Sequence, residues 1–456
     1  MKKVFKSCLL LSVTAILLLA AGVSTLYFLD FCPPPGPWPA PPWCSPGEAA
    51  CLPDVSLSDL SKMVDLNPTE QPAPEPYSLP ADFQTIFNGP EWEQHPQVSP
   101  DFMLGHTFMD IYTTGLFRHS LSQTIQAMEN TGADWVVYDN YWSYESLDPP
   151  IIRPFPTTPG FRNASKEEIC QMKAEAQQRN MQFALMLELN FDLAMGGWQG
   201  WDYAGDFWTA SQKILEEKGG HIPENQSYWE TWFQQYSVFV LDQAEIARDC
   251  QVDLFIIGKQ IDGAVKTALK PQWRTLVAQV REIYPGPISY AAFTSSGYTQ
   301  MEEFPGETLD YLIFYVYNNL TEKENSSVDE LVAAFEQLHD QQFEPLSQET
   351  GKPVIFLTPF QSRDFGARQE WFEPAAPAPD VGEDLLIQAQ MYEALFQSLE
   401  DEDWVSGVFT WGFWWRDDFN RLWEENDASF NKSSSVRNKP AEWIFKKWAE
   451  SGEPIY

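Results

Sequence analysis

The strongest constraint on the fold is an alternation of short apolar runs with segments of helical period, which begins near Met103. Such an alternation is typical of a parallel sheet whose strands are joined by crossover helices. The runs that we expect to form strands are 103–110, 135–141, 183–189, 254–260, 288–293, 311–317, 354–360 and 407–414. The segments that we expect to form helices between them include 121–129, 166–179, 228–248, 272–283, 328–349 and 384–399.

Eight strands followed by a last helix at 440–448 favour closure of the sheet into a barrel. A doubly wound open sheet would also alternate strands and helices. However, no glycine-rich turn follows the first strand, so the dinucleotide-binding fingerprint is missing from the sequence. The fifth crossover, around 301–308, is too short for a full helix. We therefore predict the α/β class and a single (β/α)₈ TIM barrel over residues 101–456.

The N-terminal segment predicts where the chain is located relative to the cell membrane. Lys2, Lys3 and Lys6 precede an uncharged apolar run from Cys8 to Leu29, which is long enough to span a bilayer. Positive charge before such a run keeps the N-terminus inside and the rest of the chain outside. We predict a membrane anchor over residues 1–31, with secretion after signal cleavage as the alternative. Residues 32–100 are rich in Pro, Gly, Ser and acidic residues and predict an extracytoplasmic stalk.

Composition narrows the classes of partner. The formal net charge is −36, and nucleic-acid binding is excluded because a phosphate backbone requires a basic face. The six cysteines form no CxxC and no Cys/His spacing suited to zinc, so we predict no metal site and no cofactor. Cys170 and Cys250 fall on predicted helices. A disulfide among Cys32, Cys44 and Cys51 would fit an extracytoplasmic stalk, although three cysteines leave one over.

In a barrel of this kind the active site lies at the C-terminal ends of the strands. Polar and aromatic residues gather there in this sequence. Amides and carboxylates bind sugar hydroxyls and aromatic rings stack on pyranose faces, although the same residues could serve only to cap the strands. The residues predicted to contact sugar are Trp142, Asn190, Asp192, Trp198, Trp201, Gln260, Tyr317, Trp411 and Trp414.

The stretch from Tyr228 to Asp262 resembles glycoside hydrolase family 113, the β-mannanase-like barrels. The resemblance covers most of residues 103–448, and the order and spacing of its motifs carry it together. These motifs include Trp232-Phe233, Ala244-Glu245-Ile246-Ala247, Gly132-Ala133-Asp134-Trp135-Val136, Trp198-Gln199-Gly200, Gly407-Val408-Phe409-Thr410-Trp411 and Lys439-Pro440-Ala441-Glu442. The resemblance implies a (β/α)₈ barrel that acts on β-linked polysaccharide such as mannan.

The family belongs to a clan of retaining hydrolases with one catalytic Glu at the end of the fourth strand and another at the end of the seventh. One carboxyl protonates the leaving oxygen and the other attacks the anomeric carbon, with the two roughly 5–5.5 Å apart. The matching positions here are Gln260 and Pro359. A Gln amide cannot donate the catalytic proton, and Pro has no nucleophile. No shift of one residue in either strand brings Glu or Asp to these positions, so the family pair is missing.

Other carboxylates near the strand ends are candidates for a relocated pair. Glu188 and Asp262 come first because neighbouring strands would bring them together, and an inverting geometry, with carboxyls about 6.5–9.5 Å apart, tolerates such relocation best. Each could instead accept a sugar hydroxyl, cap a helix or pair with a cation. The further candidates are Asp139, Asp192, Asp364 and Glu370. His106 and His119, on or just past the first strand, are expected to be structural.

Three hypotheses of function follow. The first in rank is a non-catalytic barrel that binds polysaccharide or oligosaccharide and is tethered to the membrane through its N-terminal segment. An active glycosidase with a relocated carboxylate pair is the alternative. A weaker alternative is an envelope scaffold that contacts protein. The fold does not decide between them, because one fold can carry different functions. The missing catalytic pair favours the first hypothesis.

Overall fold

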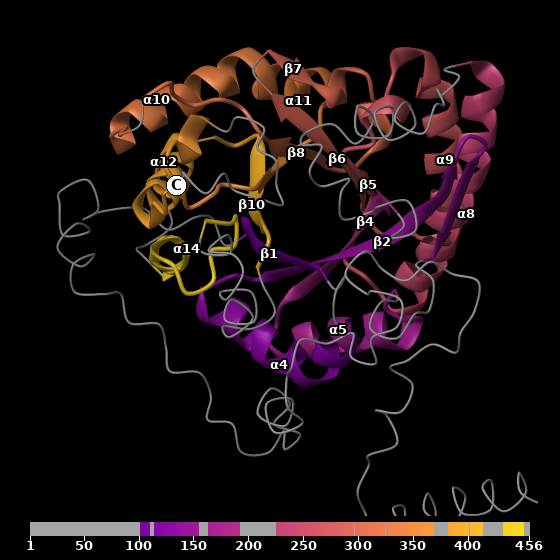
Figure 1. The fold of residues 1–456 in the computed structure, drawn as a ribbon, viewed down its shortest axis with the longest axis horizontal. Helices are drawn as coiled ribbons and strands as arrows, with labels where there is room; N and C mark the ends of the chain where they lie inside the picture. Colours follow the sequence, from indigo (N-terminus) through magenta and orange to yellow (C-terminus); the bar gives the residue numbers. More distant parts are fainter. Residues whose placement is uncertain are drawn as a thin grey trace, which may run out of the picture. The chain divides into compact units, whose positions relative to one another are not determined.

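Eight parallel strands close into a barrel in the computed structural model of the chain, and helices surround it (Figure 1). The first strand pairs with both the second and the last, so the ring of strands is complete. All eight strands predicted from the sequence are confirmed, with ends shifted by a few residues. They are β1 (Met103–Met109), β2 (Trp135–Leu147), β4 (Gln182–Phe191), β5 (Leu254–Lys259), β6 (Ile288–Ser295), β8 (Leu312–Val316), β9 (Val354–Thr358) and β10 (Val405–Trp411).

The structure describes residues 101–109, 114–154, 163–191, 225–295, 297–323, 325–368, 382–400, 402–413 and 432–450. The predicted anchor (1–31) and stalk (32–100), with the disulfide expected among the stalk cysteines, lie outside these residues and stay predictions. Within the described ranges, no helix is long and apolar enough to cross a membrane.

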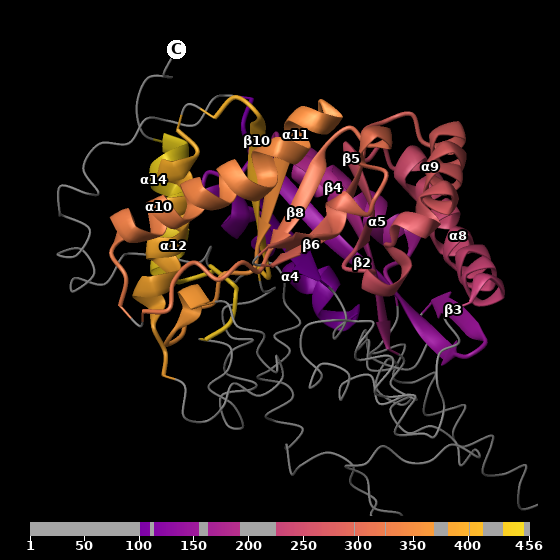
Figure 2. The ribbon, with the colours of Figure 1, turned by 90° about the horizontal axis from the view of Figure 1, so that it is seen from above.

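Two short strands were not predicted. β3 (Pro150–Pro154) pairs with β2 in an antiparallel hairpin, and β7 (Tyr298–Thr299) pairs with the end of β6. The hairpin lengthens β2 beyond its barrel section, and it projects from the end of the barrel where the strands finish (Figure 2). It therefore borders the face on which the site was predicted.

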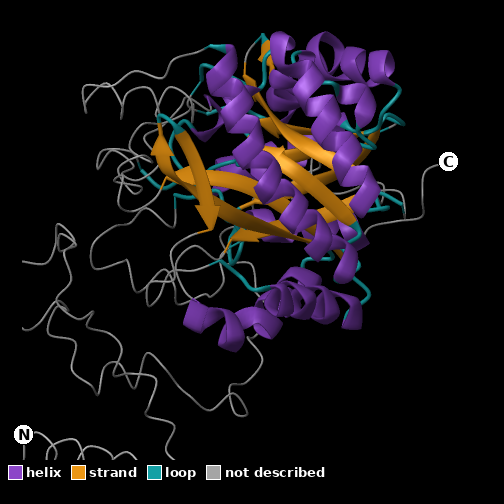
Figure 3. Cartoon of the chain, turned by 90° about the vertical axis from the view of Figure 1, so that its right-hand side faces the viewer, coloured by secondary structure: helices purple, strands orange, loops and turns teal. Residues whose placement is uncertain are grey.

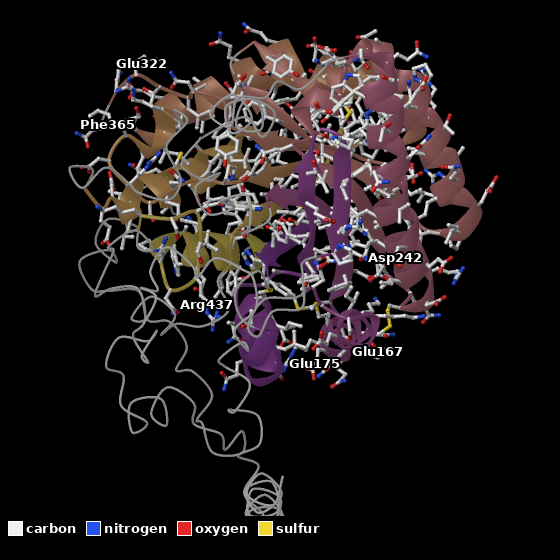
Figure 4. All side chains as sticks on the ribbon, turned by 45° about the vertical axis from the view of Figure 1, so that its right-hand side comes forward. Glu167, Glu175, Asp242, Glu322, Phe365 and Arg437 are labelled. Carbon is white, nitrogen blue, oxygen red and sulfur yellow. A yellow bond between two sulfur atoms is a disulfide. The ribbon has the colours of Figure 1, made fainter. Side chains whose placement is uncertain are left out.

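Helices form the outer layer of the barrel, with the strands enclosed between them (Figure 3). They are α4 (Thr114–Asn130), α5 (Lys166–Gln178), α8 (Gln226–Asp249), α9 (Lys270–Ile283), α10 (Val328–Leu338), α11 (Glu344–Thr350), α12 (Leu385–Ser398) and α14 (Pro440–Glu450). Their exposed carboxylates, such as Glu167 on α5 and Asp242 on α8, lie on the outer surface (Figure 4). These two carboxylates are thus solvated rather than buried.

The predicted helix at 328–349 is interrupted. A π-helical turn, His339–Phe343, separates α10 from α11, which begins with Pro345 in its first turn. Proline has no backbone N–H and its ring clashes with the carbonyl four residues earlier, so the helix widens there. The crossover at 301–308 forms two 3₁₀ turns, Gln300–Glu302 and Gly306–Thr308, as its shortness predicted.

Three aspartates link neighbouring strands at the N-terminal end of the barrel. Each lies just before a strand and accepts a hydrogen bond from a backbone N–H of the neighbouring strand. Asp134 accepts from Leu104 at 2.8 Å, Asp253 from Phe183 at 2.8 Å and Asp310 from Ile288 at 2.7 Å. Burial raises the pKa of Asp134 to about 6, although the hydrogen bond from the Leu104 N–H opposes the rise. Asp134 belongs to a motif that carried the family resemblance, and its role is structural.

The helices α5 and α8 are joined by a disulfide between Cys170 and Cys250, with the Cα atoms 4.7 Å apart. Cys250 is the residue at which α8 ends. Lys166 of α5 pairs with Asp249 of α8 at the same joint, and Lys173, one turn beyond Cys170, pairs with Asp253. One face of α5 therefore meets the end of α8 through an ion pair and a covalent bond, and the start of β5 through a second ion pair.

Candidate binding site

A buried ionic cluster lies in the lumen of the barrel near the C-terminal ends of the strands. Its members are Asp139 on β2, Glu188 on β4 and Lys259 on β5. The Lys259 ammonium lies 3.0 Å from Asp139 Oδ2 and also pairs with Glu188. The side chains of Lys259 and Asp139 are 0% exposed, whereas 18% of Glu188 is exposed. Only the Glu188 carboxyl of this trio is therefore open to a ligand.

A β-bulge brings Lys259 into the lumen. Ile256 packs in the lumen and Ile257 packs against the helices, so strict alternation would point Lys259 outward. The register between β5 and β6 shifts between Ile256 and Lys259, which reverses the alternation. Glycine fits this bulge at position 258 because it has no Cβ, and a Cβ there would lie 2.6 Å from the Tyr236 hydroxyl.

The sequence prediction overlooked Lys259. The Tyr236 hydroxyl that crowds Gly258 donates a hydrogen bond to the Ile257 carbonyl at 2.6 Å, so it is fixed in place. The signal that was available was Gly258 itself, since an isolated glycine within a strand indicates a bulge or a close approach.

The rings of Trp411 and Tyr315 lie against the ammonium, and Tyr317 contacts Tyr315. Lys259 Nζ lies 4.6 Å from the ring centroid of Trp411 and 5.4 Å from that of Tyr315. The hydroxyls of Tyr315 and Tyr317 are 3.0 Å apart. Trp411 and Tyr317, both predicted to contact sugar, are partly exposed, and the structure brings them together because both rings contact Tyr315.

The cluster controls the protonation of its own members. Burial raises the pKa of Glu188 to about 8, with Lys259 opposing the rise and the Asp139 carboxylate adding to it through its charge and a shared hydrogen bond. Burial alone would lower the pKa of Lys259, but the Asp139 and Glu188 carboxylates outweigh it and the pKa is raised. Glu188 is thus mostly protonated at neutral pH. Lys259 keeps its proton and cannot act as an amine nucleophile.

Gln260 and Pro359 are the residues predicted from the sequence to match the two catalytic strand ends. Gln260 follows directly after β5 with a left-handed φ of 51°, and its backbone N–H donates to the Ala291 carbonyl at 3.2 Å. Pro359 is buried and follows β9, on which Ile355 and Leu357 face the lumen. By alternation Pro359 faces the lumen as well. Neither position offers a carboxyl group.

The remaining predicted residues have different surroundings. Trp142 is 8% exposed and its ring stacks on Phe239 of α8 with centroids 4.7 Å apart, so it packs on the helix side of the barrel wall. Asp364 braces a loop by accepting a hydrogen bond from the Gly382 N–H at 2.6 Å. Only the backbone of Asn190 and Asp262 is described, and Asp192, Trp198, Trp201, Glu370 and Trp414 lie outside the described residues.

The pair Glu188 and Asp262 therefore stays a prediction. The described residues bring Glu188 together with Asp139 instead, through Lys259. Asp139 had been named only as a further candidate.

His106 is buried and hydrogen-bonded on both ring nitrogens, to Thr410 at 2.9 Å and Thr131 at 2.7 Å. Burial lowers its pKa to about 3, so the ring is neutral at physiological pH. This arrangement confirms the structural role expected for His106. Among the described residues, no group of three or more His, Cys, Asp or Glu side chains could hold a metal ion.

Comparison with known proteins identifies similar barrels. The model of Glycoside Hydrolase Family 113 matches residues 107–439. A GH113 β-1,4-mannanase in complex form is 18% identical with a TM-score of 0.55, over 79% of this chain and 100% of that one. The GH113 β-mannanase AaManA from Alicyclobacillus acidocaldarius, in complex with ManMIm, is 20% identical with a TM-score of 0.54, over 76% and 97%. At these identities the two structures establish a shared fold. No curated protein is similar enough to be matched.

Proposed function

Because this chain belongs to glycoside hydrolase family 113, we propose that its barrel binds β-linked polysaccharide outside the cytoplasm without cleaving it. The proposal rests on the two residues that match the family's catalytic positions in the sequence resemblance. Gln260 cannot donate a catalytic proton and Pro359 cannot attack an anomeric carbon. A barrel that keeps its fold but lacks both catalytic carboxyl groups can still bind polysaccharide.

The buried ionic cluster supports the absence of catalysis. A nucleophile must touch the substrate, and the Asp139 side chain is 0% exposed. Lys259 also neutralises the Asp139 carboxylate, so this pair offers no net negative charge to stabilise the oxocarbenium-like transition state of a glycosidase.

The partly exposed residues around the cluster support sugar binding. Trp411 and Tyr317 offer ring surface, and Gln260, directly after Lys259, offers an amide; all three are partly exposed. Rings and amides are the groups that recognise pyranose faces and hydroxyls. The similar structures are β-1,4-mannanases, so mannan and manno-oligosaccharides are the first ligands to test.

An active glycosidase is the second candidate, and one observation favours it. With its pKa raised to about 8, Glu188 would be protonated at neutral pH, as a general acid must be. Its partner carboxylate would come from Asp262 or from the segments after the strands, such as Asp192 or Glu370. An envelope scaffold that contacts protein is the weaker candidate.

The location outside the cytoplasm has two supports. The disulfide between Cys170 and Cys250 is of a kind that persists in oxidising compartments. The apolar run near the N-terminus, preceded by lysines, fits a membrane anchor with the barrel outside, or a cleaved signal.

Two assays on the full-length chain test the proposal. Release of reducing ends from mannan, glucan and xylan measures hydrolysis, and a glycan array measures binding. We expect no release, together with binding that is lost in Trp411→Ala. Hydrolysis that Glu188→Gln or Asp262→Asn abolishes would establish the glycosidase instead. Absence of binding to every glycan would leave the scaffold.

A further inference from the structure

Lys259 contacts the ring that the proposed sugar site exposes. Its ammonium lies 4.6 Å from the Trp411 centroid, and the Tyr315 ring meets the same indole edge-on at 6.1 Å. Trp411 is partly exposed at the end of β10 while Lys259 is enclosed. The cation therefore acts on the indole from inside the barrel and does not reach a ligand itself.

The position of that cation is fixed by its partners. Asp139 and Glu188 hold the ammonium from two neighbouring strands, and the Tyr141 hydroxyl donates to Asp139 Oδ2 at 3.0 Å. A desolvated cation is attracted more strongly to an aromatic face than an exposed one. A Lys259 side chain held in this way favours one orientation of the Trp411 ring.

We propose that Lys259 is a positioning residue for carbohydrate binding, which holds the Trp411 indole as a preformed platform for a pyranose ring. The proposal rests on the proposed function, since it concerns the same site. It gives the buried cluster a role that requires no catalysis. A rigid platform loses less conformational entropy when a ligand binds, and this raises affinity.

The test uses the full-length chain labelled with 5-fluorotryptophan, in which Trp411→Phe assigns the Trp411 resonance in the ¹⁹F spectrum. The test variant is Lys259→Met with Asp139→Asn, which removes the ion pair without leaving a buried charge on Asp139. We expect the Trp411 resonance to shift and broaden. The affinity for mannohexaose, measured by calorimetry, should fall at least about tenfold.

Two further variants make the result specific. Lys173→Met with Asp253→Asn removes a comparable ion pair at the opposite end of the barrel, where the side chains are 10% and 27% exposed. This variant should leave the Trp411 resonance and the affinity unchanged. Lys259→Arg keeps the positive charge and should restore most of both.

The outcomes separate this inference from the proposed function. If wild type binds no oligosaccharide, the proposed function fails, while the Trp411 resonance still tests the positioning role. An unchanged Trp411 resonance in the Lys259→Met and Asp139→Asn variant would overturn the positioning role, whether or not the affinity falls.

Discussion

The Lys259 ammonium lies 3.0 Å from the Asp139 carboxylate, and neither side chain has any exposed surface. This pair stands in the lumen of the barrel, directly before Gln260. Of the residues in this cluster, a ligand can contact Glu188, which is mostly protonated at neutral pH, but not the enclosed Lys259 ammonium.

Lys259→Met should lower the free energy of unfolding by about 3–5 kcal/mol, because it leaves a buried carboxylate without its partner. Urea unfolding measures the change. The control is Lys323→Met, which removes a surface ion pair whose side chains are 62% and 45% exposed and should change stability by no more than about 1 kcal/mol. Equal effects of the two substitutions would show that the lumen pair does not stabilise the fold.

Glu188 should make stability depend on pH. Its pKa is raised from 4.5 to about 8 in the folded chain, so its stabilising contribution is complete below about pH 4.5 and is lost as the pH rises through 8. The slope is at most about 1.4 kcal/mol per pH unit. The difference in unfolding free energy between wild type and Glu188→Gln should therefore fall between pH 5 and pH 8.5. Glu336→Gln changes an exposed carboxyl on α10 and should show no such trend. A difference that is flat with pH would refute the raised pKa.

Removal of the disulfide with Cys170→Ser and Cys250→Ser should lower the unfolding free energy by about 2–5 kcal/mol, because the bond closes a long loop. The two cysteines are 80 residues apart in sequence. A reductant should destabilise wild type by a similar amount and leave the double variant unchanged. A free thiol at Cys170 in protein isolated without reductant would contradict the pairing.

Gly258→Ala should destabilise the barrel by about 1–3 kcal/mol, because the new Cβ would lie 2.6 Å from the Tyr236 hydroxyl. The substitution should also move Lys259, whose lumen position depends on the bulge. Removing the hydroxyl with Tyr236→Phe should recover part of the loss in the double variant. Absence of any recovery would mean that the hydroxyl is not what excludes a side chain at Gly258.

The sequence predicted the barrel well because parallel strands buried on both faces read as continuous apolar runs, as in Leu254–Lys259. It predicted the site less well. Lys259 was missed because the bulge at Gly258 reverses the alternation on which such predictions rest. Cys170 and Cys250 were placed on helices but not paired, because their contact depends on how α5 and α8 pack. Pro345 was a local signal for the interruption between α10 and α11, but the helical period of the segment led to the prediction of one continuous helix.

The central claim, binding without cleavage, is tested most directly by titrating mannohexaose into the full-length chain in a calorimeter and then recovering the ligand for mass spectrometry. Trp411→Ala is the control for binding at the site. The account predicts saturable binding that the control loses, with the hexasaccharide recovered intact. Recovery of shorter manno-oligosaccharides from wild type would contradict it and would show that the barrel is an active glycosidase.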